Sequence, residues 1–97
     1  MDTPNIITST QNEKVKLAYG LQNRGRTRRK EHKIALEGIK LVRDAMERGH
    51  KPMFVLYDPE AIGNDIIKSL KKHAPNADYL AVSSDVMKHI AEAEQPQ

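Results

Sequence analysis

Segments with the pattern of strands alternate with segments with the pattern of helices along this chain of 97 residues. Residues 52–58 (PMFVLYD) and 77–83 (ADYLAVS) are apolar runs of strand length with branched and aromatic side chains. A shorter run, 33–37 (KIALE), would place Ile34 and Leu36 on one side of a third strand. Between the runs, apolar residues recur every three or four positions, as on one side of a helix. Because parallel strands need long crossover connections, this alternation favours a mostly parallel sheet.

Four helices are expected, at residues 10–24, 39–49, 59–73 and 84–91. Thr10 and Glu13 fit the capping box, in which each side chain accepts a hydrogen bond from the backbone amide of the other. Asp58 followed by Pro59 has the residue types of a helix start, and Ser84 can begin the last helix. The order helix, strand, helix, strand, helix, strand, helix predicts the α/β class and a three-layer α/β/α sandwich in one domain.

Composition excludes several kinds of site. The chain has no cysteine, so disulfide bonds, thiolate metal sites and cysteine nucleophiles are all excluded. Its four histidines lack the H-x-x-x-H spacing and are interpreted as solvated: His32, His50, His73 and His89. The glycine spacings of nucleotide-binding loops do not occur. The N-terminus has no cationic leader, and no window approaches the roughly 20 apolar residues of a membrane span, so a soluble, cytoplasmic protein is expected.

Positive charge is concentrated in one short block, residues 24–33 (RGRTRRKEHK). The block holds six basic residues and one acidic residue, whereas the other 87 residues hold ten basic and twelve acidic residues. Four of the six are arginine, whose planar guanidinium binds phosphate at two points. A membrane contact would need an apolar face, which the block lacks. The block therefore favours a contact with a phosphate backbone, with a solvated loop as the alternative.

The block has two small residues and no apolar anchor, so we expect a mobile turn in the absence of RNA. Lys14 and Lys16 would extend the positive patch if this turn folds back on the first helix.

Few other residues qualify for chemistry. Glu37 ends the expected strand 33–37 and precedes Gly38, so its side chain would project over the edge of the sheet. Both a structural role and a ligand contact are open for it. Ser83 and Ser84 lack the glycines of a nucleophile elbow and are interpreted as helix caps. The remaining acidic pairs are interpreted as solvated helix faces: Asp44 with Glu47, and Glu92 with Glu94.

An ordered series of residues carries a family resemblance: Asn12, Val15-Lys16, Leu21, the arginine-rich block, Ile34-x-Leu36-Glu37-Gly38-x-x-Leu41-Val42, Ala45-Met46 and Gly49. This series is similar to the N-terminal substrate-binding domain of the SpoU (TrmH-type) RNA 2′-O-ribose methyltransferases. The resemblance implies a fold like that of ribosomal protein L30e, which is an α/β/α sandwich. The order of elements derived above agrees with that fold.

By this resemblance the domain would bind structured RNA, with ribosomal RNA expected, and deliver a ribose to a catalytic domain. The residues implied by the resemblance are Asn12, Lys16, Arg24, Arg26, Arg28, Arg29, Glu37 and Gly38. Lys30 and Lys33 of the basic block complete the candidate RNA-binding set. Two departures could alter which RNA is favoured: Ile34 stands where the family often has phenylalanine, and the turn is unusually rich in arginine.

The resemblance also implies that S-adenosylmethionine and the methyl-transfer residues belong to a knotted catalytic domain beyond residue 97. These residues alone are therefore expected to be monomeric and to have no cofactor, no metal and no catalytic residue, and the full-length protein is expected to be a homodimer. One alternative is a stand-alone L30e/L7Ae-like protein that binds kinked RNA. Another is a protein-interaction domain whose basic turn docks on an acidic partner. RNA affinity that is absent or independent of salt would favour this alternative.

Overall fold

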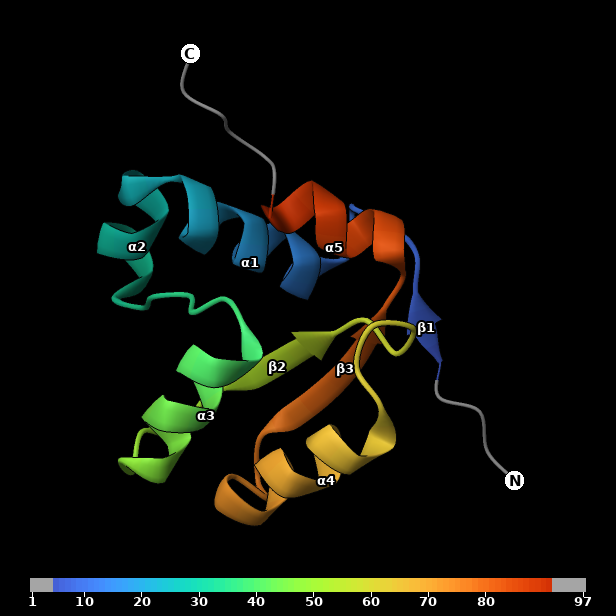
Figure 1. Ribbon diagram of the computed structural model, residues 1–97. Coiled ribbons are helices and arrows are strands. Elements are labelled where there is room, and N and C mark those ends of the chain that lie inside the picture. Colours follow the sequence, from blue (N-terminus) through green and yellow to red (C-terminus); the bar gives the residue numbers. More distant parts are fainter. Residues whose placement is uncertain (1–4, 92–97) are drawn as a thin grey trace.

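A parallel sheet of three strands forms the middle of the domain (Figure 1). The computed structural model describes residues 5–91. The elements in chain order are β1 (Ile6–Ile7), α1 (Glu13–Asn23), α2 (Gly25–Glu31), α3 (Ile39–Glu47), β2 (Phe54–Tyr57), α4 (Asn64–His73), β3 (Asp78–Val82) and α5 (Ser84–Ala91). The strand order is β1-β3-β2, so β3 is central and pairs in parallel with both neighbours.

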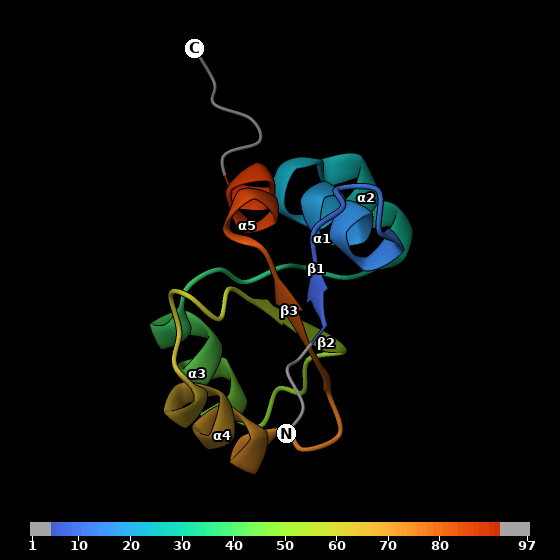
Figure 2. The same ribbon diagram turned by 90° about the vertical axis from the view of Figure 1, so that its right-hand side faces the viewer.

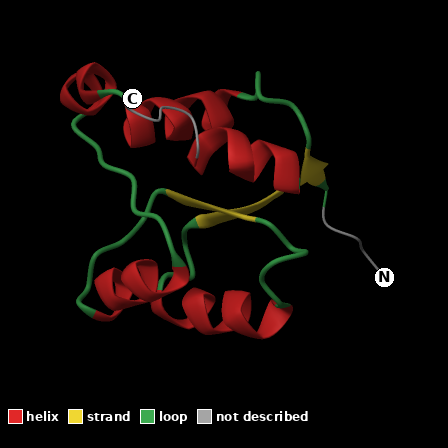
Figure 3. Ribbon diagram, turned by 45° about the horizontal axis from the view of Figure 1, so that its top comes forward, coloured by secondary structure: helices red, strands yellow, loops and turns green. Residues whose placement is uncertain are grey.

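Helices cover both faces of this sheet. Figure 2 shows α1, α2 and α5 on one side and α3 and α4 on the other, and Figure 3 shows the strands between the two helical layers. One core joins α1, α5 and the sheet, and contains Val15, Val82, Val86 and Ile90, with Ile7, Ala18, Leu56 and Met87 packed against them. The other core contains Met46, Ile67, Leu70 and Ala74, with Val55, Tyr57 and Tyr79 from the strands. The predicted α/β class and three-layer arrangement are confirmed.

The strand predicted at residues 33–37 is wrong. These residues form no strand, and Ile34 is 71% exposed while Leu36 is 41% exposed. The additional strand is instead β1, where Ile6 pairs with Ala81 of β3 and Ile7 pairs with Val82. Two apolar residues are too few to show a period, so this strand is defined by its partner and not by its own sequence.

Two of the predicted helix starts are also wrong. The cap of α1 is Asn12 and not Thr10, because Asn12 Oδ1 accepts from the backbone nitrogens of Lys14 at 2.9 Å and Val15 at 3.2 Å. Thr10 therefore forms no capping box, and the helix is capped by Asn12, two residues later.

The second wrong start concerns α4, which begins at Asn64 and not at Pro59. Asp58 Oδ1 accepts from the backbone nitrogen of Glu60 at 2.9 Å, and this contact belongs to a turn. The last helix begins at Ser84 as predicted, and the hydroxyl of Ser83 accepts from the backbone nitrogen of Val86 at 3.2 Å. The expected helix 39–49 is confirmed as α3.

The prediction of a turn for the basic block is wrong, because most of the block forms the helix α2. The helix ends at His32, which has a left-handed φ of 56°. No residue of α2 is buried, and the helix is held by its contacts with α1. A Cβ atom at Gly20 would lie 2.9 Å from Thr27 Cγ2, so the two helices approach closely at this glycine. Arg28 Nη1 adds a hydrogen bond of 2.8 Å to the carbonyl oxygen of Leu21.

Tyr79 links the central strand to the end of α4. Its hydroxyl donates to the carbonyl oxygens of Ala74 at 2.8 Å and Leu70 at 3.2 Å. These carbonyls belong to the last turn and the C-cap of α4, where they also accept from the backbone nitrogens of Ala74 and Ala77. Burial raises the pKa of the Tyr79 phenol above its ordinary value of 10.0.

Gly20→Ala should displace α2 from α1, because the new methyl group would meet Thr27 at a distance that real side chains do not adopt. Such overpacking costs about 1–3 kcal/mol. We expect faster amide hydrogen exchange across residues 25–31 than in the wild type. The double variant Gly20→Ala/Thr27→Ala removes the obstacle and should restore most of the protection. Unchanged exchange in Gly20→Ala alone would show that this contact does not position α2.

Tyr79→Phe should lower the free energy of unfolding at pH 7 by about 1 kcal/mol, because the hydrogen bonding of the phenol hydroxyl to the two carbonyl oxygens is lost. The raised pKa means that the folded state favours the protonated phenol. This contribution is fully present below the unfolded pKa of 10.0 and is lost as the pH rises through the higher folded value. Urea unfolding at pH 7 to 11 measures both effects. An alkaline decline that is as large in Tyr79→Phe as in the wild type would contradict this assignment.

Candidate nucleic-acid interface

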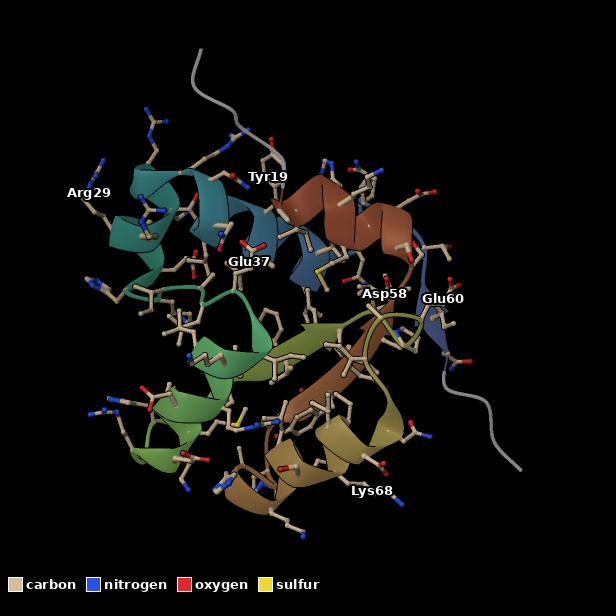
Figure 4. All side chains as sticks on the ribbon, in the orientation of Figure 1. Tyr19, Arg29, Glu37, Asp58, Glu60 and Lys68 are labelled. Carbon is tan, nitrogen blue, oxygen red and sulfur yellow. The ribbon has the colours of Figure 1, made fainter. Side chains whose placement is uncertain are left out.

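Helix α2 displays most of the cations of the basic block on the surface. The exposed basic residues are Arg24 at its N-cap and Arg26, Arg28, Arg29 and Lys30 within it. Figure 4 shows Arg29 projecting away from the rest of the molecule. Basic side chains in the last turn face the negative end of the helix dipole, which stabilises a short helix of like charges.

Three cations of the block are engaged within the protein. The guanidinium of Arg28 is bonded to the Leu21 carbonyl, as described above. The Arg24 guanidinium stands 5.5 Å from the ring centroid of Tyr19, a cation–π contact. Lys33 Nζ donates to the backbone oxygen of Glu31 at 3.2 Å and lies 4.0 Å from its carboxylate.

The remaining three cations of the basic block are Arg26, Arg29 and Lys30, and all three lie in α2. No hydrogen bond or ion pair within residues 5–91 engages their side chains. One acidic residue, Glu31, accompanies them in the helix, and it is already beside Lys33. These three side chains are therefore available to an external anion.

Glu37 and Gly38 lie near the junction of α1 and α2. Gln22 Nε2 donates to Glu37 Oε1 at 2.9 Å, which fastens the loop before α3 to the last turn of α1. Gly38 has a φ of 101°, a conformation that favours glycine, and its carbonyl accepts from Val42 at the start of α3. The predicted position at the end of a strand is wrong, because no strand precedes these residues. The structure nevertheless joins Glu37 to the last turn of α1, the helix that leads into α2.

Asn12 and Lys16 lie toward the opposite end of α1. A helix of eleven residues is about 16 Å long, so Asn12 is far from the α2 cations. Its side-chain oxygen is also committed to the helix cap. Lys14 does not extend the patch, because its ammonium stands 5.5 Å from the ring centroid of Phe54. The structure thus places Glu37 at the end of α1 that leads into α2 and separates Asn12 from that end.

An aromatic pair beside the end of α1 escaped the sequence analysis, which interpreted His89 as solvated and did not single out Tyr19. Tyr19 of α1 and His89 of α5 are stacked, with ring centroids 4.7 Å apart and an angle of 23° between the ring planes. Asn23 Nδ2 donates to the carbonyl oxygens of Tyr19 at 2.9 Å and Ile90 at 3.1 Å, which ties the ends of the two helices together. The sequence has no signal for this pair, because the two residues belong to the first and last long helices of the domain.

The carboxyl ends of the strands are the usual site of ligands in parallel sheets. Asp58 is buried there, and its Oδ2 accepts from the hydroxyl of Ser84 at 2.7 Å. Its Oδ1 is occupied by the amide of Glu60, so both oxygens have structural partners. Figure 4 shows Asp58 and Glu60 on the side of the molecule away from Arg29. This edge offers no free pair of catalytic groups.

Other kinds of site find no support within residues 5–91. No group of three or more histidine, aspartate or glutamate residues is placed to hold a metal ion in this range. No helix of the described part of the chain is long and apolar enough to cross a membrane. Asp44 is exposed and pairs with Arg48 at 3.1 Å, as expected for a solvated helix face. Glu92 and Glu94 lie outside the described residues.

A comparison with protein families supplies the context for this surface. The family model described as MRM3-like substrate binding domain matches residues 12–97, which include every element from α1 to α5. Comparisons with curated proteins and with solved structures give no match. The family confirms the resemblance to the substrate-binding domain of SpoU-type RNA methyltransferases, and with it a substrate-binding role in RNA methylation. This chain belongs to the MRM3-like substrate-binding domains.

Proposed function

We propose that this chain is the RNA-recognition domain of an S-adenosylmethionine-dependent RNA 2′-O-ribose methyltransferase, and that α2 grips the phosphate backbone of its substrate. Ribosomal RNA is the substrate class that we propose. The observation that carries the proposal is the set of three unpaired cations on α2: Arg26, Arg29 and Lys30. The match to a substrate-binding family supports this proposal over a stand-alone RNA binder or a protein-interaction domain.

The geometry of α2 supports a grip that positions RNA without reading its sequence. Arginine and lysine that neutralise phosphates release counterions, which gives affinity for any backbone. Sequence is read by contacts to bases, which phosphate contacts cannot replace. Because the Gly20–Thr27 contact and the Arg28 bond hold α2 against α1, its free cations are presented in a defined place.

The described residues do not fit a site for S-adenosylmethionine. The groove along α3 has a volume of about 1060 Å³ but is open to solvent and would not enclose a ligand, and the hollow lined by residues 51–52 and 74–77 has a volume of only about 170 Å³. Pockets for drug-sized ligands commonly have about 300–1,000 Å³ and enclose most of the ligand. We therefore assign cofactor binding and methyl transfer to a separate catalytic domain. A homodimer formed through that domain and a cytoplasmic location complete the proposal.

Binding to a structured ribosomal RNA fragment across a salt series tests the role of α2. Arg26→Ala/Arg29→Ala should weaken binding and reduce the slope of log K against log salt by about 1.5, because two phosphate contacts are lost. Arg28 is left in place because its guanidinium also holds α2 to α1.

The matched control is Lys68→Ala/Lys72→Ala, which removes the same charge from two exposed positions of α4. Figure 4 shows Lys68 on the helical layer that lies on the other face of the sheet from Arg29. This variant should keep the wild-type slope. Equal reductions in the two double variants would mean that RNA responds to net charge alone, and α2 would then have no special role.

A further inference from the structure

The aromatic pair beside the basic helix has no evident role in either core. Besides its four histidines, the chain has three tyrosines and one phenylalanine. Tyr57 and Tyr79 pack against the core between the sheet and the helices α3 and α4. Tyr19 instead stacks on His89, which is exposed, and the two rings lie on the outer helical layer. Figure 4 shows Tyr19 at the outer surface of that layer, on the side of the molecule where Arg29 also projects.

The three groups Arg24, Tyr19 and His89 form a cluster of planar side chains around the Tyr19 ring, here called the column. The Arg24 guanidinium lies 5.5 Å from the Tyr19 ring centroid, and the His89 ring lies 4.7 Å from it. Both Arg24 and His89 are exposed, so each presents a planar group to solvent. A planar group of the same kind could therefore extend the stack.

The column is held in place before any ligand arrives. Asn23 Nδ2 bridges the carbonyl oxygens of Tyr19 and Ile90, and Ile90 is the direct neighbour of His89. This bridge fixes the backbone that carries both rings. A preformed stack loses little conformational entropy when it binds, which favours affinity.

Chemistry identifies a nucleobase as the ligand for this column. Unpaired bases of RNA stack on aromatic rings and on arginine guanidinium planes. The column begins at Arg24, which is the N-cap of α2, so one RNA strand could place phosphates on α2 and a base on the stack. Bases in a continuous duplex are stacked on each other and are not available.

We infer that Arg24, Tyr19 and His89 form a stacking site for an unpaired nucleobase of the RNA whose phosphates bind α2. The inference rests on the proposed function and deepens it, because it assigns a preference for RNA with an unpaired segment. The phosphate contacts of α2 cannot supply this preference, since duplex and loop both carry phosphates.

The test compares an RNA hairpin with an unpaired loop and a blunt duplex with the same number of phosphates. The wild type should bind the hairpin about tenfold more tightly than the duplex. His89→Ala should lose that preference and keep the duplex affinity and the salt slope of the wild type. His89→Phe, which retains an aromatic ring, should keep the preference. Arg26→Ala/Arg29→Ala should weaken binding of both RNAs and preserve their ratio.

The outcomes separate this inference from the proposed function. Binding of both RNAs by the wild type, with an unchanged hairpin preference in His89→Ala and Tyr19→Leu, would overturn the stacking site and leave α2 as the RNA grip. Failure of the wild type to bind either RNA would overturn both. Unfolding midpoints in urea show that each variant is folded, and His89→Ala changes an exposed side chain. Loss of preference in His89→Ala with rescue by His89→Phe supports the site.

Discussion

The parallel pairing of β3 with both other strands is the constraint on which the domain depends. β1 and β2 do not pair with each other, so β3 alone joins them into a sheet. Successive side chains of β3 point to opposite faces, which puts Val82 in the core with α1 and α5 and Tyr79 in the core with α3 and α4. A substitution in β3 therefore affects the packing of both helical layers. The position of α1, and through it that of the basic helix, follows from this sheet.

The basic helix shows how a charged segment can be ordered without being buried. It contributes no residue to a core, and a short helix of its length would be marginal in isolation. A glycine in α1 lets the backbones approach, and Arg28 satisfies a carbonyl oxygen near the end of that helix. One arginine thus stabilises the surface on which the others are displayed. The arginine-rich composition serves structure through Arg28, and in the proposed function it serves anion binding through Arg26 and Arg29.

The sequence predicted the elements whose apolar patterns are long enough to read. The runs at 52–58 and 77–83 became β2 and β3, and the helices that follow Gly38 and precede Pro75 were found. Prediction failed where the pattern was short or ambiguous. Ile34 and Leu36 alternate like a strand but are exposed, while Ile6 and Ile7 form a strand that no periodicity marks. Thr10 and Asp58 have the residue types of helix caps, but Asn12 caps α1 and Asp58 lies in a turn.

For the candidate site, local charge in the sequence was sufficient to locate the patch, because counting six cations in ten residues requires no structure. The family resemblance was likewise carried by the order of residues along the chain. Which cations are free was decided only by the fold, since Arg28 and Lys33 take partners that helix geometry brings to them. The stack of Tyr19 on His89 was decided there too, because the packing of α1 against α5 joins residues from opposite ends of the chain. The charge of a segment follows from its composition. Hydrogen bonds and ring stacking depend on the distances between side chains, which only the folded chain defines.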